Sequence, residues 1–292
     1  MVPSKTWLAI PIMAIACAAL AFALREPPTA AIAIGALAAA AAAAVRAFAG
    51  SSLAAATTAG AAALLVALGV LDLAPPMLAH ELPRAALAAG AALFAIAELA
   101  RPLPVDASPL PAIGAALVAG VLDPAYVALF AIAGVRLLLG PWSRPRWAVI
   151  VPVIGTLAIG IAVLAACATS GVFADLWHVW AARSGTATPL ALLAQAGDTL
   201  GPIAALAALA GLAVCSSRGR YAAAATIAVT AGALGVDLAC RSLGAATIAI
   251  AGVGAGVGVA RLAATVRWPT GQTFVGATAG FLIVVAPAML RW

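Results

Sequence analysis

The chain has 292 residues, of which 66% are hydrophobic and 8% are charged, and its mean hydropathy is +1.17. Soluble domains carry roughly 25% charged residues, so this composition excludes an ordinary water-soluble protein and predicts an integral membrane protein. The formal net charge is +6, but the basic residues form no cluster with interleaved aromatic residues. It therefore argues against nucleic acid as a partner and favours orientation against an anionic inner leaflet.

A membrane-spanning helix needs roughly 20 mostly apolar residues. By this rule the alanine-rich chain divides into eleven candidate apolar segments. They lack the alternation of a lipid-facing barrel, so they predict helices, separated by short links in which proline stops each helix. The sequence thus predicts one all-α, polytopic domain over residues 1–292. The segments are Trp7 to Leu24, Thr29 to Val45, Leu53 to Leu71, Ala85 to Ala100, Leu110 to Leu122, Ala125 to Leu139, Ala148 to Thr169, Thr199 to Val214, Ala222 to Ala239, Leu243 to Ala260 and Thr273 to Leu290.

The distribution of basic residues predicts the orientation. With a cytoplasmic N-terminus, ten of the 15 basic residues lie inside or near that boundary, whereas most acidic residues lie outside. All seven tryptophans lie at segment ends or in links, where indole rings prefer to sit. We therefore expect a multi-pass protein of the cell inner (cytoplasmic) membrane. The first segment contains Ala21-Phe22-Ala23, which resembles a cleavage site, but retention as a first transmembrane helix is the favoured interpretation.

Cysteine and glycine patterns both favour structural roles. The four cysteines form no C-x-x-C pair and the chain has two histidines, so we expect no metal site and no cofactor. The run from Gly252 to Gly258 lacks the lysine of a phosphate loop. Two small-x-x-x-small steps, Gly252 with Gly256 and Gly254 with Gly258, instead predict a flat face for close helix packing.

The apolar stretch from Leu110 to Leu139 is interrupted at Asp123-Pro124. Each piece reaches about 20 Å at 1.5 Å per residue, short of a hydrocarbon core of roughly 30 Å. The pattern predicts a hairpin of two short helices entering from the cytoplasmic side, with its tip in a wet or protein-lined cavity. Asp123 before Pro124 is also typical of a helix N-cap, and capping alone is the simpler alternative.

Residues 170–198 form the longest polar-containing stretch, predicted at the outer face. Phe173, Leu176, Trp177 and Trp180 recur at helical spacing, which predicts an amphipathic helix on the outer leaflet. A further apolar turn or two is expected from Pro189 to Ala196. A polar pocket roofed by this segment would be lined by Asp175, His178, Arg183, Gln195 and Asp198. A solvated interfacial helix without a ligand is the simpler alternative.

The middle of the chain resembles membrane glycosyltransferases of the GT-C type. The likeness covers about Leu110 to Ala239 and consists of hydropathy and turns: Gly114 to Pro124, an apolar helix to Leu139, a Trp/Arg/Pro-rich turn, a long helix from Ala148, Trp177 and Trp180, and Leu200-Gly201-Pro202-Ile203 before a further helix. The resemblance implies transfer of a sugar from a polyprenyl-phosphate donor at the outer face, with a carboxylate of the first outer loop as base.

This chain departs from that pattern in its first outer loop, which is only Arg25-Glu26-Pro27-Pro28 and leaves no room for an acidic motif. We therefore expect a non-catalytic structural or accessory subunit of a larger membrane assembly, in contact with the bilayer and with other membrane proteins. The alternative is an active transferase that binds a polyprenyl-phosphate lipid. Its base would be Glu26, Asp72 or Asp123, and its donor phosphate would bind to Arg84 and Arg183.

Small-solute transport is the second alternative. Transporters place ionisable groups on broken helices near the midplane and often show inverted repeats. Here the carboxylates lie near helix ends and no internal repeat is visible. Glu98 lies about one turn inside the fourth segment, and an ion pair with Arg101, three residues later, is its ordinary explanation.

Overall fold

The computed structural model describes residues 9–24, 26–50, 52–72, 82–100, 110–139, 146–174, 188–217, 219–240 and 244–289. Over these ranges the chain is helical and contains no strand. Its elements are α1 (Ala9–Ala23), α2 (Pro28–Ala49), α3 (Leu53–Asp72), α4 (Leu82–Ala100), α5 (Leu110–Leu122), the 3₁₀ turn η3 (Pro124–Tyr126), α6 (Val127–Leu138), α7 (Arg146–Thr169), α9 (Pro189–Leu200), α10 (Pro202–Ser216), α11 (Arg220–Cys240), α12 (Ala245–Ala264) and α13 (Pro269–Met289).

Five helices of the described residues are long and apolar enough to cross a membrane by themselves, namely α2, α3, α4, α11 and α12. Shorter apolar helices accompany them, including most of α1, α5, α6, α10 and the second part of α7. The prediction of an all-helical, multi-pass membrane protein is confirmed at this level. Each of the eleven predicted segments coincides largely with a helix.

Several helix ends differ from the predicted segment ends by three or four residues, and one of these differences reflects a separate helix. The segment expected to begin at Thr199 instead begins at Pro202, because Gly201 adopts a φ of 82° and separates two helices. Thr199 and Leu200 end α9, and the N–H of Gly201 closes that helix by donating to the carbonyl of Gly197 at 2.8 Å. Pro202 suits the first position of α10 because that position needs no backbone donor.

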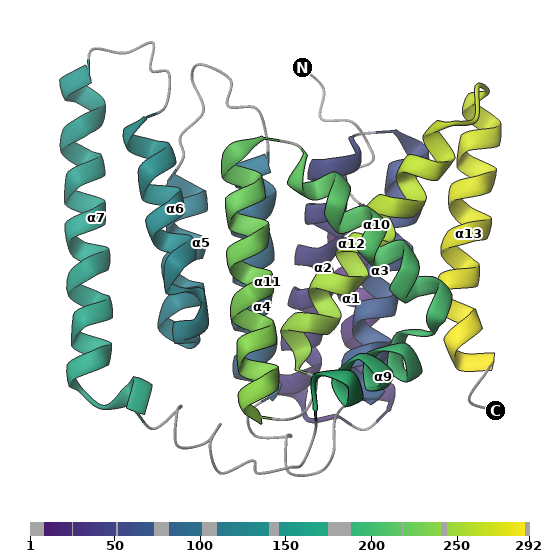
Figure 1. Cartoon of the computed structure of the whole chain (residues 1–292), viewed down its shortest axis with the longest axis horizontal. Helices are drawn as coiled ribbons and strands as arrows, with labels where there is room; N and C mark the ends of the chain where they lie inside the picture. Colours follow the sequence, from purple (N-terminus) through teal and green to yellow (C-terminus); the bar gives the residue numbers. More distant parts are fainter. Residues whose placement is uncertain are drawn as a thin grey trace.

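Successive helices run in alternating directions through the bundle (Figure 1). Helices α1, α3, α5, α7, α11 and α13 end toward the side on which Asp123 lies, here called the Asp123 end. Helices α2, α4, α6, α10 and α12 end on the opposite side, called the Glu98 end. The core lies where α2, α3, α4 and α12 meet, and its fully buried side chains include Ile34, Leu37, Val66 and Ile248.

The glycines of α12 allow two neighbouring helices to approach it closely. A Cβ on Gly254 would lie 2.5 Å from the carbonyl oxygen of Ala208 in α10. A Cβ on Gly256 would lie 2.8 Å from the Cβ of Ala62 in α3. Gly258 also faces α10, and Gly252 also faces α3. The sequence predicts one flat face, whereas the structure has two, because residues two positions apart lie about 200° apart around a helix.

The break at Asp123-Pro124 forms a hairpin within the bundle. Asp123 has an extended backbone (φ −148°, ψ 113°), and its carboxylate accepts a hydrogen bond from the N–H of Ala125 at 2.9 Å. The predicted cap is therefore present. The hairpin turns back before the level at which α7 and α11 end (Figure 1). Its tip is lined by protein, since Tyr126 is 3% exposed and a Cβ on Gly232 of α11 would lie 2.6 Å from the Ala125 oxygen.

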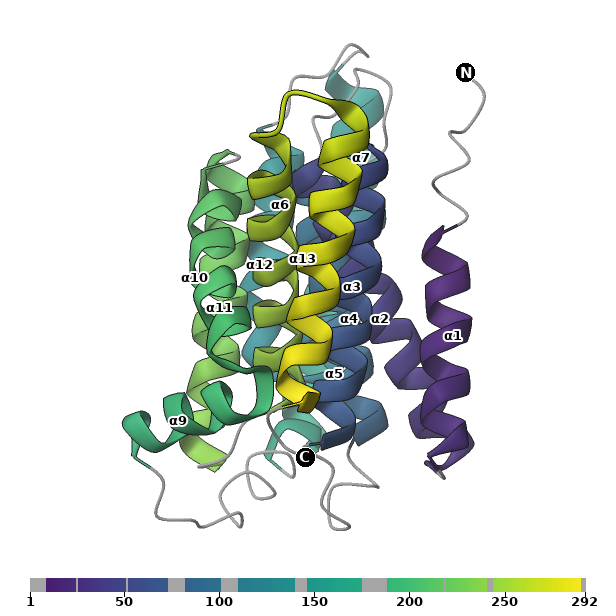
Figure 2. The same cartoon turned by 90° about the vertical axis from the view of Figure 1, so that its right-hand side faces the viewer.

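Helix α9 lies across the Asp123 end of the bundle rather than along it (Figure 2). Thr188 caps it by accepting a hydrogen bond from the N–H of Ala191 at 3.2 Å, and Pro189 occupies its first position. The sequence predicts only a turn or two here, whereas the structure has a 12-residue helix. The amphipathic helix predicted around Trp177 and Trp180 lies outside the described residues.

Candidate functional site

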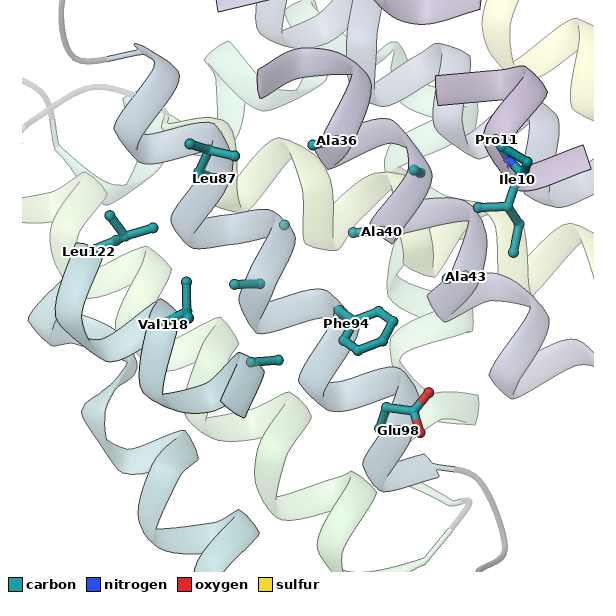
Figure 3. A pocket seen from close by; sticks show the side chains of 14 residues that line it. Ile10, Pro11, Ala36, Ala40, Ala43, Leu87, Phe94, Glu98, Val118 and Leu122 are labelled. Atoms are coloured by element: carbon teal, nitrogen blue, oxygen red, sulfur yellow. The ribbon is translucent and has the colours of Figure 1, made fainter. Parts of the chain in front are cut away.

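An apolar groove of about 820 Å³ lies between α1, α2, α4 and α5. Its floor is made by α2 and α4, which pack against each other, and its two walls are α1 and α5. Four small residues of α2 keep the floor smooth, namely Ala36, Ala39, Ala40 and Ala43. Figure 3 shows Leu87 and Leu122 at one end of the groove and Glu98 at the other.

The shape and lining of the groove suit a hydrocarbon chain. Leu87 and Glu98 are eleven positions apart on α4, which corresponds to about 16 Å of helix. Phe94 and Val118 project into it from α4 and α5 (Figure 3). Such a length covers roughly half of a 30 Å hydrocarbon core. The lining is therefore apolar along that length, apart from Glu98 at one end.

At the Asp123 end the structure brings together two residues that the sequence analysis names for different reasons. The Nε–H of Arg84, in the first turn of α4, donates a hydrogen bond to the carbonyl oxygen of Leu122 at 2.8 Å. Leu122 is the last residue of α5, so Arg84 caps the C-terminus of that helix, where a cation is favourable. Asp123 follows directly, and the positive charge of Arg84 acts on its carboxylate.

The environment of Asp123 raises the pKa of its carboxyl above the ordinary value, because burial penalises the charged form. The hydrogen bond from Ala125 and the charge of Arg84 lower it and offset only part of that effect. This carboxyl therefore takes up a proton more readily than an exposed one. The surroundings of Asp123, one of the candidate bases, therefore favour proton transfer.

A pH-dependent stability effect follows from this shift. Because the folded pKa of Asp123 exceeds its unfolded value, the unfolded state loses the proton first, and stability falls as the pH rises through this interval. Asp123→Asn removes the carboxylate and keeps a good capping side chain. We expect the variant to match the wild type at about pH 3.5, below the reference pKa of roughly 3.9, and to exceed its stability at pH 7. Detergent-micelle unfolding at both pH values measures this, with the exposed Asp198→Asn as control. A less stable variant at pH 7 contradicts it.

The Glu98 end is organised by a residue that the sequence analysis did not name as a site. Arg136, at the end of α6, is 9% exposed and donates from Nη1 to the carbonyl oxygens of Glu98, at 3.2 Å, and of Leu99. It thereby caps the C-terminus of α4. The Glu98 carboxylate also acts on Arg136 electrostatically. The predicted partner of Glu98, Arg101, lies outside the described residues.

The remaining predicted residues are distributed over other parts of the chain. Glu26 is half-buried between α1 and α2, and its N–H donates to the carbonyl of Ala21 at 3.1 Å. Asp72 is the last residue of α3, but its side chain lies outside the description. Gln195 and Asp198 belong to α9, which packs on α3, α10, α11 and α13, and none of these helices lines the groove. Outside the described residues lie Asp175, His178 and Arg183.

Within the described ranges, no three His, Cys, Asp or Glu side chains lie close enough together to hold a metal ion. The described cysteines Cys17, Cys167 and Cys215 are free thiols. No protein-family model matches the chain, and no curated protein or solved structure shows significant similarity to it.

Proposed function

We propose that the chain is a non-catalytic structural subunit of a larger assembly in the cell inner membrane. In this proposal its eleven apolar segments, including the short Asp123-Pro124 hairpin that enters from the cytoplasmic side, form a GT-C-like bundle in the membrane with a cytoplasmic N-terminus, so that the Asp123 end faces outward. The observation that carries the proposal is the exposed surface of α7, a helix that packs on the other described helices by one side only.

Helix α7 stands at the edge of the molecule, beside α5 and α6 (Figure 1). Its inner side fits these neighbours, since a Cβ on Gly160 would overlap the ring of Phe130 of α6. On the other side, small residues recur at helical spacing and are exposed, namely Gly155, Ala158, Ala162 and Ala166. A Cβ on Gly155 would meet nothing within 4 Å. We call these four residues the α7 outer stripe.

A small-residue stripe favours a protein neighbour over lipid. Lipid tails give no hydrophobic drive for helix association, so helices in membranes pack where small side chains let two backbones approach closely. The glycine and alanine contacts of α12 show that this chain associates its own helices in that way. The α7 outer stripe offers the same kind of surface to a helix of another subunit.

Purification from native membranes tests the proposal. Ala162→Trp, in the middle of the stripe, is expected to reduce recovery of a stoichiometric partner at least about tenfold, which corresponds to about 1.4 kcal/mol of binding free energy. Leu206→Trp, at an exposed site on α10, is the matched control and is expected to leave recovery unchanged. Mild-detergent affinity purification with quantitative mass spectrometry measures both. Cys167, adjacent to the stripe, provides a thiol for cross-linking. Equal recovery with both variants, or a wild-type chain without a partner, would overturn the proposal.

The groove favours a second candidate function, the transfer of a sugar from a polyprenyl-phosphate lipid. In that case the lipid chain lies in the groove, Arg84 contacts the phosphate and Asp123 accepts the proton of the acceptor hydroxyl. The same purification separates the two candidates, because lipid extracts are analysed alongside the proteins. A transferase retains a polyprenyl phosphate that Arg84→Gln loses, and it needs no partner chain.

A further inference from the structure

The side chain of Asp237 is a buried carboxyl that the proposed functions do not use. It lies in the last turn of α11, within the candidate span Arg220–Leu238, and it is 2% exposed. Its Oδ2 atom has no hydrogen-bond partner among the described residues. An ionisable side chain inside a membrane segment is costly to keep there and generally marks a functional site.

One oxygen of this carboxyl has a partner and the other does not. The N–H of Gly244, at the start of α12, hydrogen-bonds to Asp237. A Cβ on Gly244 would lie 2.8 Å from Oδ1, so glycine leaves room for the carboxyl there. The Thr247 hydroxyl lies beside the carboxyl and interacts with it, but no well-directed hydrogen bond joins them. Oδ2 and the Thr247 Oγ1 therefore both lack a well-directed partner among the described residues.

The cap that Asp237 forms on α12 gives Oδ1 a hydrogen-bond partner, but it does not explain why Oδ2 is buried. The positive end of a helix stabilises a negative charge near it only modestly. Burying an ionised carboxylate without a cation costs more than that interaction returns. Among the described groups that act on Asp237, Gly244 and Thr247 are neutral, and none is a cation. Within the part of the chain that the structure describes, a negative charge on Oδ2 is therefore poorly compensated.

Among the described residues, the titratable groups within electrostatic range of Asp237 include one from the hairpin tip. Tyr126 is buried and lies within electrostatic range of both Asp237 and Asp123. Asp123 is only half-buried and adjoins Arg84. These groups form a series, here called the acidic series, that leads from a partly accessible carboxyl past a tyrosine hydroxyl to a buried carboxyl. Such a series offers hydroxyl and carboxyl oxygens between which a proton can be exchanged.

We propose that Asp237 is a proton-binding site, loaded on Oδ2 and reached from the Asp123 end through the acidic series. A proton on Oδ2 removes the uncompensated charge and supplies a donor for the neighbouring Thr247 oxygen. Its uptake and release also couple the hairpin tip to the end of α11, because η3 packs on α11 and Tyr126 lies within electrostatic range of Asp237. The proposal is independent of any partner bound to α7.

Labelling with dicyclohexylcarbodiimide tests this proposal on the wild-type chain in native membranes. This apolar reagent takes the proton of a buried carboxylic acid on one nitrogen, while the carboxyl oxygen bonds to its central carbon. Rearrangement then gives a stable N-acylurea. Peptide mass spectrometry is expected to find the adduct on Asp237 and to show at least about a tenfold decrease in labelling between low and high pH. Asp237→Asn, which resembles the protonated acid in shape, is expected to lose only this adduct.

Three results would overturn the proposal. The first is an unmodified Asp237 at every pH in a sample in which Glu98 or Asp123 is labelled. The second is labelling of Asp237 that does not change with pH. The third is protection of Asp237 by sodium at constant ionic strength, which would assign the site to a metal cation instead. Because the wild-type chain is labelled, the test does not depend on whether Asp237→Asn folds.

Discussion

Gly211→Leu is expected to destabilise the bundle by about 3 kcal/mol or more, because overpacking a close contact typically costs 1–3 kcal/mol and sometimes more. A Cβ on Gly211 of α10 would overlap the carbonyl group of Gly254 in α12. Nearby, a Cβ on Gly258 would lie 2.6 Å from the oxygen of Ala207. Backbone faces backbone at this contact, so no side chain can turn away to make room, and α10 has to separate from α12.

Unfolding in detergent micelles, followed by circular dichroism during heating or titration with dodecyl sulfate, measures this loss. Gly235→Ala in α11 is the matched control, since a Cβ there meets nothing within 4 Å. Alanine in a helix interior is favoured over glycine by roughly 0.5–1 kcal/mol, so the control is expected to be slightly more stable than the wild type. Similar stability of Gly211→Leu and the control would show that the two helices do not approach as described.

Arg136→Leu is expected to lower stability by about 2–4 kcal/mol. The substitution removes the donor to the last carbonyls of α4, and each buried acceptor left without a partner costs roughly 1–3 kcal/mol. Within the hydrocarbon region of a membrane, no water is available to replace the lost hydrogen bonds. Arg136→Lys keeps the charge but loses the planar fork of donors, so we expect an intermediate value.

The same unfolding assay compares these variants with Arg261→Leu. Arg261 lies in the last turn of α12 and is exposed, so its replacement is expected to change stability by less than about 0.5 kcal/mol. If Arg136→Leu were as stable as Arg261→Leu, the contact with α4 would make no net contribution. If Arg136→Lys were as stable as the wild type, the positive charge alone would account for the contribution of Arg136 to stability.

Helix positions could be predicted from this sequence because lipid demands long apolar segments and proline ends them. The packing of those helices could not, since alanine faces lipid and core alike and leaves little difference between helix faces. The glycine run of α12 illustrates this limit. Its spacing predicts close packing. Only the structure shows that Gly252 and Gly256 face α3, whereas Gly254 and Gly258 face α10.

The candidate site was predictable only in its parts. Asp123 is marked by the proline that follows it, and Arg84 by its place near a segment end. Their proximity depends on how α4 is aligned with α5, which no local pattern encodes. Arg136 and Asp237 carried a weaker signal, an ionisable residue close to the end of an apolar segment. Their significance lies in burial, at 9% and 2% exposure, and burial depends on the neighbouring helices.

The two arginine caps make the contacts of the two groove walls chemically different. Arg84 fastens α4 to the end of α5, and Arg136 fastens α6 to the end of α4, so these three helices are tied at opposite ends by charged hydrogen bonds. The contacts of α1 with α2 and α3 are mostly apolar, apart from a weak thiol hydrogen bond from Cys17 to the carbonyl of Ala63 at 3.9 Å. The α5 side of the groove is therefore held by charged hydrogen bonds, whereas α1 is held by close packing, since a Cβ on Gly35 of α2 would lie 2.7 Å from the carbonyl oxygen of Ala14.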